Sequence, residues 1–479
     1  MKILNNSTHH AELVSALSAN SKIIIFFNSI LIILSVVSCL KTPDEISEEQ
    51  GIILPDENEI FNTNTQPISP NNAVTIEFSN GQAIIENPYQ ENGVTINVVE
   101  QHVTIRSTLT NTDVNYVLSG KTTAGSVKIY SEYRFGLVLN GVSIQNPQGA
   151  AINIQSGKRI SVTLVDKTSN RLIDEGVFQF IDGEDMKGTF FSEGQLIFNG
   201  EGSLLIYSNY GHAICSDDFI QINNGRITVN NAIRDGFHCN EYLQINGGNI
   251  EINKAKSDGL ECEKGYIIVS GGSIKVNNCG EKGLKSADKI TITGGKIELT
   301  TKDNGLQSVK NIVVAGGEIF IDSNKTGTLS AEGQITVAGG LLISSAKNNA
   351  FDCGTFSITG GRVVGVGSAT VKPTADVCTQ RSVVWGASGF TAEQLIFITS
   401  TNSEIMTFKL PRTYSENMAL VFSAPSLQAD ASYTIFKGGT VSGDNNFNGF
   451  YNDATSSGGT EAAKFTTSSM VTTIGNVNY

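Results

Sequence analysis

Basic residues and tryptophan are scarce in this sequence. The 479 residues include 33 lysines and arginines against 46 acidic residues, a formal net charge of -13, and a single tryptophan. Binding of nucleic acid needs a basic surface that neutralises phosphates, so this balance argues against DNA or RNA as a partner. An acidic surface instead suits cations or neutral ligands.

Long hydrophobic runs are almost absent as well. The one clear run, "IIIFFNSILIILSVVS", follows Lys22 and has 16 residues, which is short for a membrane span. It ends in Val36-Val37-Ser38 directly before Cys39, and this resembles a bacterial lipoprotein signal. We therefore predict a signal peptide over 1–38 and lipidation of Cys39, with a plain membrane anchor or a cleaved secretory signal as alternatives. The expected location is the bacterial outer membrane or cell surface.

Apolar residues are also few in the stretch that follows. Residues 40–72 contain seven acidic residues and one lysine, among scattered prolines. Such a segment buries too little apolar surface to fold by itself, so 39–72 is predicted to be a flexible acidic tether.

The body of the chain has no CxxC motif and no dense cysteine spacing. Its cysteines are Cys215, Cys239, Cys262, Cys279, Cys353 and Cys378. An exported protein can form disulfides, and Cys239 and Cys262 are candidates for one. The alternative is that these thiols pack in the core as small hydrophobic groups, which their positions below favour.

Glycine, by contrast, is abundant, and it recurs at a fixed interval. Gly-Gly or Asn-Gly pairs stand at 224–225, 247–248, 271–272, 294–295, 316–317, 339–340 and 360–361. Short alternating runs such as "YLQINGGNIEINK" and "KITITGGKIELTT" flank them, and this alternation predicts strands with one buried face. A period of 21 to 24 residues indicates a solenoid.

The predicted fold is all-β. Three short strands in each repeat form one coil of a right-handed parallel β-helix, which we place at 73–367. A leucine-rich repeat would need leucine-spaced positions and a helical half, and a meander barrel would need antiparallel partners. After residue 367 the period is lost, so 368–479 is predicted to be a β-rich cap or small β-sandwich that covers the open end.

The segment from Lys187 to Ile274, "KGTFFSEGQLIFNGEG…KSDGLECEKGYIIVSGGSI", resembles a family of bacterial carbohydrate-binding β-helix proteins. The resemblance extends upstream through "GLVLNGVSIQNPQGAAINIQSGKRISVTLVDKTSN" and downstream to "KFTTSSMVTTIG". That family binds cellulose and acidic sugars, carries calcium and is similar in fold to pectate lyases. The resemblance thus implies calcium-assisted glycan binding without demonstrated catalysis.

Stacked coils turn equivalent residues into rows with neighbours about 5 Å apart. The first strand of each repeat predicts an inward row that includes Phe237 and Leu260, and a second inward row of small residues that includes Cys239, Cys262 and Ser286. Between them an outward row runs Cys215, His238, Glu261, Lys285, Gln307, Leu329 and Asp352. Its polar end is where we predict the site.

Several residues around this row carry side-chain oxygen atoms, which are the ligands that calcium prefers. The predicted calcium ligands are Asp217, Asp218, Asp235, Asn240, Asp258 and Glu263. Asp235 and Asp258 each precede a glycine, so ordinary turn chemistry with a positive φ at the glycine is the alternative explanation.

The predicted carbohydrate-binding residues are His238, Glu261, Lys282 and Lys285. Lysines beside carboxylates would balance charge along the stack, or would recognise a uronate carboxylate. Tyr242 and Tyr266 are candidates for sugar stacking or for capping the core. A lyase would use a lysine of this group as the base that removes a proton next to a calcium-polarised carboxylate.

The leading hypothesis is an exported, lipid-anchored and monomeric β-helix protein that binds polysaccharide, cellulose or an acidic pectic glycan, with calcium. The first alternative is a calcium-dependent polysaccharide lyase that acts on the same face. The second is an adhesin-like surface solenoid with a purely structural role.

Overall fold

The computed structural model describes residues 73–479 apart from 402, 444–445 and 453. These residues belong to one structural unit, Ile60–Tyr479. The predicted signal peptide, Cys39 and the predicted tether lie outside the described residues. Within the described residues, no helix is both long and apolar enough to cross a membrane.

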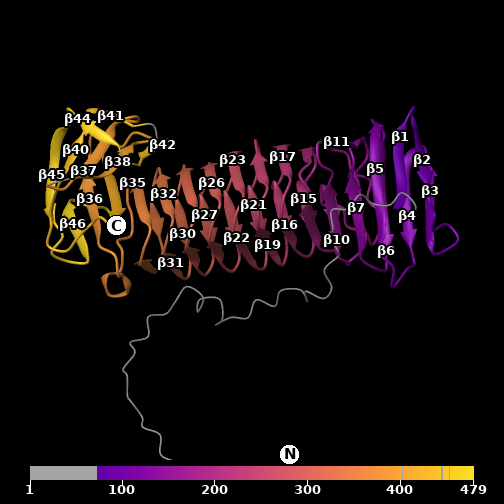
Figure 1. Ribbon diagram of the computed structural model, residues 1–479, viewed down its shortest axis with the longest axis horizontal. Helices are drawn as coiled ribbons and strands as arrows, with labels where there is room; N and C mark the ends of the chain where they lie inside the picture. Colours follow the sequence, from indigo (N-terminus) through magenta and orange to yellow (C-terminus); the bar gives the residue numbers. More distant parts are fainter. Residues whose placement is uncertain (1–72, 402, 444–445, 453) are drawn as a thin grey trace, which may run out of the picture. The chain divides into compact units, whose positions relative to one another are not determined.

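Strands stack coil upon coil along one axis and form three faces (Figure 1). Face one is a 12-stranded sheet. It consists of β3 (Val94–Val99), β4 (Gln101–Ser107), β6 (Gly125–Ser131), β9 (Ile152–Ile154), β12 (Gly188–Ser192), β15 (His212–Ser216), β18 (Phe237–Cys239), β21 (Leu260–Cys262), β24 (Leu284–Ser286), β27 (Leu306–Ser308), β30 (Thr328–Ser330) and β33 (Phe351–Asp352).

Face two follows face one after a short turn in each coil. Its strands are β1 (Ala73–Ser79), β2 (Gln82–Glu86), β5 (Val114–Thr122), β7 (Phe135–Leu139), β10 (Ile160–Leu164), β13 (Leu196–Asn199), β16 (Ile220–Ile222), β19 (Tyr242–Ile245), β22 (Tyr266–Val269), β25 (Ile290–Ile292), β28 (Ile312–Val314), β31 (Gln334–Val337) and β34 (Thr355–Ile358).

Face three completes each coil. It contains β8 (Ser143–Asn146), β11 (Ser169–Asp174), β14 (Ser203–Tyr207), β17 (Arg226–Asn231), β20 (Asn249–Ile252), β23 (Ser273–Cys279), β26 (Lys296–Thr301), β29 (Glu318–Ser323), β32 (Leu341–Ala346) and β35 (Arg362–Gly367). From β4 to β35 the neighbouring strands pair in parallel, and partners on face one such as Phe237 and Leu260 lie 23 residues apart. The predicted parallel β-helix is confirmed.

The glycine pairs mark the corner between faces two and three. The second glycine of each pair has a positive φ, for example 76° at Gly272 and 87° at Gly295, and this conformation disfavours other residues. A Cβ atom on Gly272 would also lie 2.7 Å from the backbone carbon of Gly247 in the preceding coil. Glycine therefore recurs in the sequence for two reasons: the turn needs a positive φ, and the coils stack too closely for a side chain.

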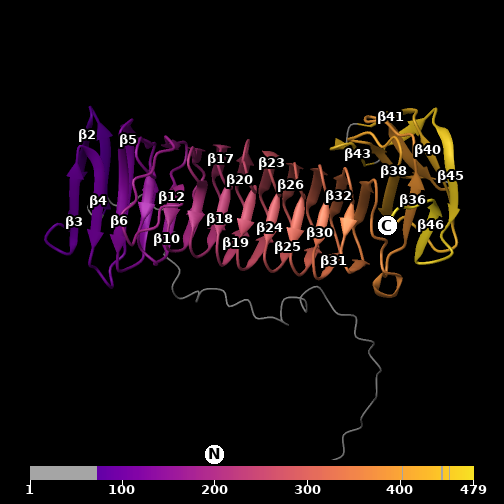
Figure 2. The same cartoon turned by 180° about the vertical axis from the view of Figure 1, so that it is seen from behind.

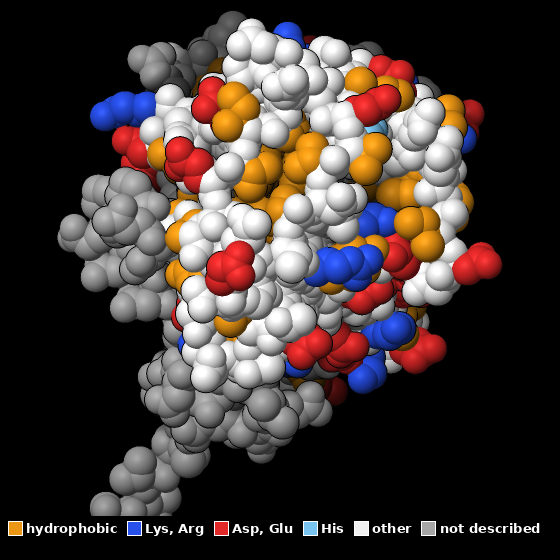
Figure 3. Space-filling view, turned by 90° about the vertical axis from the view of Figure 1, so that its right-hand side faces the viewer, with side chains coloured by type: hydrophobic (Ala, Val, Ile, Leu, Met, Phe, Trp, Pro, Cys, Tyr) orange, Lys and Arg blue, Asp and Glu red, His pale blue; other side chains and the backbone are white. Residues whose placement is uncertain are grey.

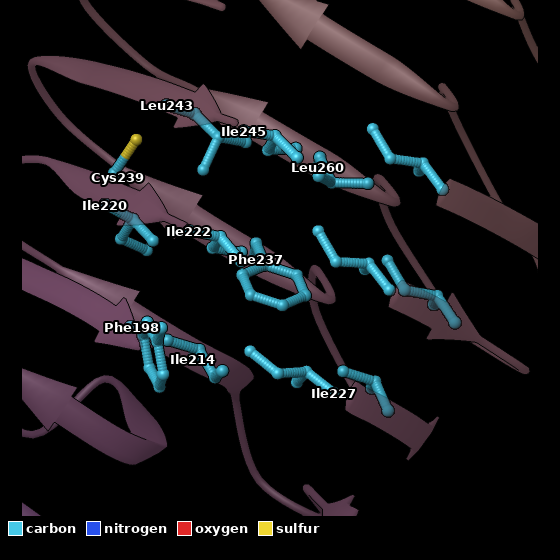
Figure 4. Close-up of a cluster of buried hydrophobic side chains, with 14 of the residues drawn as sticks. Phe198, Ile214, Ile220, Ile222, Ile227, Phe237, Cys239, Leu243, Ile245 and Leu260 are labelled. Carbon is cyan, nitrogen blue, oxygen red and sulfur yellow. The ribbon is translucent and has the colours of Figure 1, made fainter. Parts of the chain in front are cut away.

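The interior is a continuous column of aliphatic and aromatic side chains (Figure 4). Phe237 and Leu260 of the predicted inward row are fully buried, as is Cys239. The small-residue row stays buried from Ser216 to Ser330 but reaches intermediate exposure at Cys353. All six described cysteines are free thiols, so Cys239 and Cys262 pack in the core and are not bridged.

The two ends of the β-helix differ. At the N-terminal end β1 pairs with β2, and β3 with β4, in antiparallel hairpins. Hydrophobic side chains are visible on the surface there, where Ile84 of β2 is 50% and Val99 of β3 is 61% exposed (Figure 3).

At the C-terminal end face three continues into three further strands. They are β39 (Met418–Ser423), which is antiparallel to β35, then β36 (Ser382–Ala387) and β46 (Val471–Gly475). A separate six-stranded sheet contains β37 (Leu395–Thr399), β38 (Glu404–Lys409), β40 (Ser432–Lys437), β42 (Asn446–Phe447), β43 (Phe450–Tyr451) and β45 (Thr460–Thr466). The remaining elements are the 3₁₀ turn η4 (Ala375–Val377) and a pair, β41 (Thr440–Ser442) and β44 (Thr455–Ser457).

Candidate functional site

Aspartates of the turn before face one connect successive coils. Oδ1 of Asp235 accepts the backbone N–H of Asp258 at 2.8 Å, and Oδ1 of Asp258 accepts that of Lys282 at 2.7 Å. Both side chains are 3% exposed. Asn304 repeats the contact with the N–H of Thr326 two coils further on. One oxygen of each aspartate therefore has a structural role.

The glycines after these aspartates do not have a positive φ, which corrects the sequence-based explanation. Gly236 and Gly259 are needed for close packing instead. A Cβ atom on Gly236 would lie 2.7 Å from the carbonyl oxygen of Gly259, and one on Gly259 would lie 2.6 Å from that of Gly283. The carbonyl of the next coil occupies the space where a side chain would begin.

The second oxygen of Asp235 faces two histidines. Nδ1 of His212 lies 3.0 Å and Nδ1 of His238 lies 3.3 Å from Oδ2, and the two imidazole rings stack at 4.3 Å. His238 also lies 3.0 Å from Oε2 of Glu261 on the next strand of face one. The strand β18, labelled in Figure 2, pairs with β15 on one side and β21 on the other. These strands and the turn before β18, which carries Asp235, bring two imidazoles and two carboxylates together.

Lys285 on β24 contacts two carboxylates of this region. Its Nζ contacts Oε1 of Glu261 and lies 3.3 Å from Oδ2 of Asp258. Glu261 and Asp258 are buried, whereas the Lys285 side chain is 35% exposed. We call Asp235, His238, Asp258, Glu261 and Lys285 the polar ladder.

The surroundings shift several pKa values in this ladder. Burial would lower the pKa of His238, but its contacts with Asp235 and Glu261 outweigh burial and raise the pKa to about 9. Burial raises the pKa of Asp258 to about 6. For Asp235 the histidine contacts prevail over burial and lower the pKa. For Lys285 the contacts with Glu261 and Asp258 prevail over burial and raise it.

The other predicted site residues lie around the ladder. Asp217 pairs with Lys187 at 2.7 Å, and Asn240 donates to the Asp217 carbonyl at 3.0 Å. Asp218 accepts from Gln195 at 2.8 Å. Glu263, with a side chain 56% exposed, lies 3.5 Å from Nε2 of His238.

Lys282 lies at the edge of the ladder, where it pairs with two other carboxylates. Its Nζ is 2.7 Å from Glu281 and 3.4 Å from Asp303. The predicted site residues thus lie in one region, as the sequence indicates. In the structure they belong to several separate ion pairs and not to a single cluster.

The outward row is less exposed than its place on face one suggests. Cys215 is fully buried, as is Phe191 on the preceding coil, and Glu261 is 8% exposed. Lys187, which ends the long connection from β11 to β12, pairs with Asp217 and lies 5.7 Å from the ring of Phe191. This connection, residues 175–187, is the feature that sequence periodicity does not reveal.

Of the two roles considered for Tyr242, sugar stacking or capping of the core, the structure fits the second. Its ring lies between Phe219 at 4.3 Å and Tyr266 at 5.4 Å, and it is 7% exposed. Tyr266 keeps intermediate exposure, and Lys289 lies over its ring at 5.7 Å. The three rings form a stack along face two and stabilise the coils.

Among the residues that the structure describes, two groups of side chains have the spacing of metal ligands. Ligand atoms of Asp235, Asp258 and Glu261 lie within 4.8 Å of one another, and so do those of His212, Asp235 and His238. Oxygen ligands opposite each other on calcium are about 5 Å apart, so the carboxylate group has a suitable size for this ion. Calcium would have to displace the ammonium of Lys285, which lies between two of these carboxylates.

A family model described as "Carbohydrate-binding domain-containing protein" matches residues 99–369, more than half of the chain. The chain belongs to this family. The match includes the entire polar ladder and ends two residues after β35, so the C-terminal strands lie beyond the family region.

A carbohydrate-binding domain-containing protein of Acetivibrio thermocellus is 32% identical over 118 residues. The match covers 24% of this chain and 41% of that relative, so the chain spans less than half of its length. Among solved structures, the polysaccharide lyase-like protein from C. thermocellum, in a gadolinium derivative, is similar with 24% identity and a TM-score of 0.40. That comparison covers 60% of this chain and 97% of the other.

Proposed function

We propose that this protein binds polysaccharide through its β-helix. The observation that supports this most directly is the family match, because residues 99–369 are the coils themselves and include the polar ladder. Rows of equivalent side chains along a stack of coils suit a ligand that is itself a repeating chain.

The sugar contacts in this proposal come from the exposed edge of the ladder. Lys285 and Glu263 are the accessible charged groups there, and His238 is 12% exposed. Glu261, Asp235 and Asp258 are buried and hold these side chains in place. Fixed donors and acceptors of this kind orient hydroxyl or carboxylate groups of a bound glycan.

The same contacts disfavour a lyase in which Lys285 is the base. Its pKa is raised because the attraction of Glu261 and Asp258 exceeds the effect of burial. An ammonium held in this way donates hydrogen bonds or pairs with a carboxylate, and it does not accept a proton near neutral pH. Binding is therefore the function that this geometry favours.

Calcium is part of the proposal, as an ion that competes with Lys285 for Asp258 and Glu261. Lys285→Met should therefore increase the thermal stabilisation by calcium, since it removes the competing ammonium. Without calcium the variant should be less stable, because buried carboxylates lose their partner. If calcium shifts the melting temperature equally before and after the substitution, these carboxylates do not bind it.

Export and lipid anchoring by Cys39 complete the proposal, with the outer membrane or the cell surface as the location. The expected result is that the chain fractionates with membranes when expressed in a bacterium, and that Cys39→Ser releases it. Mass spectrometry of the mature N-terminus tests the same point, since a lipidated cysteine has a distinct mass. An unmodified N-terminus upstream of Cys39 would contradict the anchor.

A glycan array with residues 73–479 tests binding itself, with and without calcium. We expect binding to cellulose-type or pectic polysaccharide, and weaker binding by Lys285→Met when the ligand is acidic. If no glycan on the array binds with or without calcium, a structural role for the solenoid is favoured. Absorbance of unsaturated products on pectic substrate would favour the lyase.

A further inference from the structure

An exposed aromatic group projects from the long connection between β11 and β12. Phe178 stacks on Tyr210 at 4.1 Å with ring planes 16° apart, and Phe180 lies 5.9 Å from the same tyrosine. Phe180 is 57% and Tyr210 is 36% exposed. Large aromatic side chains that face solvent as a group indicate a binding surface.

A buried carboxylate holds this group in position. Asp174 is fully buried, and it accepts the N–H of Gly176 at 2.9 Å and the N–H of Asn209 at 3.1 Å. Gly176 precedes Phe178, and Asn209 precedes Tyr210. At the far end of the connection Glu184 pairs with Lys128 at 2.7 Å. The aromatic rings are thus presented on a segment anchored at both ends.

A row of residues, exposed except for the half-buried Gly280, continues from Tyr210 along the corner between face three and face one. The backbone N–H of Arg234 bonds to the carbonyl of Gly211, so these two residues are equivalent in successive coils. The residues directly before them are then equivalent too, and Ile233 occupies the place of Tyr210 one coil further on. Ala232, Ala255, Cys279, Thr301, Ser323 and Ala346 then pair in parallel from coil to coil. The residues that follow them form the row Ile233, Lys256, Gly280, Lys302, Asn324 and Lys347.

Lysines stand on alternate coils of this row. Lys256, Lys302 and Lys347 are exposed, and no ion pair joins any of them to another described residue. Two coil steps separate neighbouring lysines by about 9–10 Å. In a chain with net charge -13, this is an uncompensated basic strip beside an aromatic one.

We propose that an acidic polysaccharide binds along this row, parallel to the β-helix axis. Its sugar rings stack on Phe180 and Tyr210, and its carboxylates meet Lys256, Lys302 and Lys347. From Tyr210 to Lys347 the row spans six coil steps, roughly 29 Å, which is an extended surface for an oligosaccharide. Charge complementarity favours an acidic chain over a neutral one.

This inference rests on the proposed polysaccharide binding and adds a surface next to the polar ladder. The test is isothermal titration of residues 73–479 with an oligogalacturonate and with a cello-oligosaccharide of equal length. The charge variant carries Lys256→Gln, Lys302→Gln and Lys347→Gln. Its control carries Lys158→Gln, Lys167→Gln and Lys464→Gln, three exposed lysines outside the row, so both variants lose the same charge.

The row variant should bind oligogalacturonate at least tenfold more weakly than the control and with a smaller dependence on salt. Its binding of the neutral oligosaccharide should not change. Phe180→Ala with Tyr210→Ala should weaken binding of both, since stacking does not depend on charge. Unchanged melting temperatures of all variants show that the fold is intact.

The outcomes separate the two claims. If the wild-type chain binds neither oligosaccharide, the proposed function and this inference both fail. If it binds oligogalacturonate and the row variant equals its control, the row is not the surface although polysaccharide binding stands. If a DNA oligonucleotide of equal charge binds as strongly, the strip recognises polyanions in general and the assignment to an acidic polysaccharide is wrong.

Discussion

Oδ1 of Asp235 accepts a hydrogen bond of 2.8 Å from the backbone N–H of Asp258, its equivalent one coil further on. The contact is internal to the fold, yet the two residues are also the charged centre of the polar ladder. The same carboxylates therefore bind the backbone and, in the function proposed above, position His238 and Lys285. Substitutions that keep one role while removing the other can separate them.

Asp258→Asn should stabilise the protein at pH 8. The amide oxygen can still accept the N–H of Lys282, whereas the buried charge disappears. Burial raises the pKa of Asp258 to about 6 in the folded chain, so its favourable contribution is complete below pH about 4 and is lost as the pH rises through 6. We expect a gain of roughly 1 to 3 kcal/mol in the free energy of unfolding at pH 8, and little change at pH 4, by urea denaturation.

Asp258→Ala is the matched control for that experiment. The alanine removes the acceptor as well as the charge, so the N–H of Lys282 loses its partner. Compared with Asp258→Asn, this variant should be less stable by about 1 to 3 kcal/mol at both pH values. Equal losses for the asparagine and alanine variants at pH 8 would mean that the ionised carboxylate stabilises the ladder.

His238 should make stability depend on pH in a different window. Its folded pKa of about 9 lies above the ordinary value of 6.5, so its stabilisation is complete below pH 6.5 and is lost as the pH rises through 9. Wild-type protein should lose roughly 1 to 3 kcal/mol between these values, and His238→Gln should show a flatter profile. A titration of the His238 imidazole by NMR with a midpoint below 7 would contradict this explanation.

Gly265→Ala should be strongly destabilising. A Cβ atom there would lie 1.7 Å from the carbonyl oxygen of Glu241 in the preceding coil, and backbone cannot move aside without breaking the stack. A loss of about 3 kcal/mol or more is expected. Gly157→Ala is the control, since nothing lies within 4 Å of its Cβ position, and its melting temperature should stay near that of the wild type. Similar melting temperatures for both variants would refute close stacking at Gly265.

Cys239→Ser should be tolerated. The thiol of Cys239 points to the carbonyl of Tyr242, and two coils away the hydroxyl of Ser286 donates to the corresponding carbonyl of Lys289 at 3.0 Å. A serine at 239 has the same acceptor, so the cost should remain below about 1 kcal/mol. Cys239→Val adds volume to a full interior and should cost about 1 to 3 kcal/mol. The comparison uses thermal unfolding, and a large loss for serine would show that the hydroxyl finds no acceptor.

The coils were predictable because one residue pattern repeats. Each glycine pair and each alternation of apolar residues reports the same local geometry, and Phe237 and Leu260 fall on the interior as their positions require. The small-residue row follows from the same register. Long-range structure could be read from local signals here, since every coil contacts mainly its two neighbours.

The position of the ladder was predictable from the sequence, but the burial of side chains around it was not. Register places Glu261 between His238 and Lys285, and this arrangement is observed. Register did not predict that Cys215 is buried, nor the exposed group of Phe178, Phe180 and Tyr210. Phe178 and Phe180 belong to the connection 175–187, where the period is interrupted. A segment that occurs once in the chain leaves no second copy for comparison, so its course had to come from the structure.

The antiparallel pairing of β39 with β35 also ends the stack of coils. A parallel β-helix presents at its last coil the same edge that each new coil pairs with, and such an edge can recruit another molecule as fibrils do. Because β39 runs antiparallel and occupies that edge from Val363 to Gly367, the stack stops there. Face three then continues through β36 to β46, so its last edge among the described residues belongs to β46 and not to a coil of the β-helix.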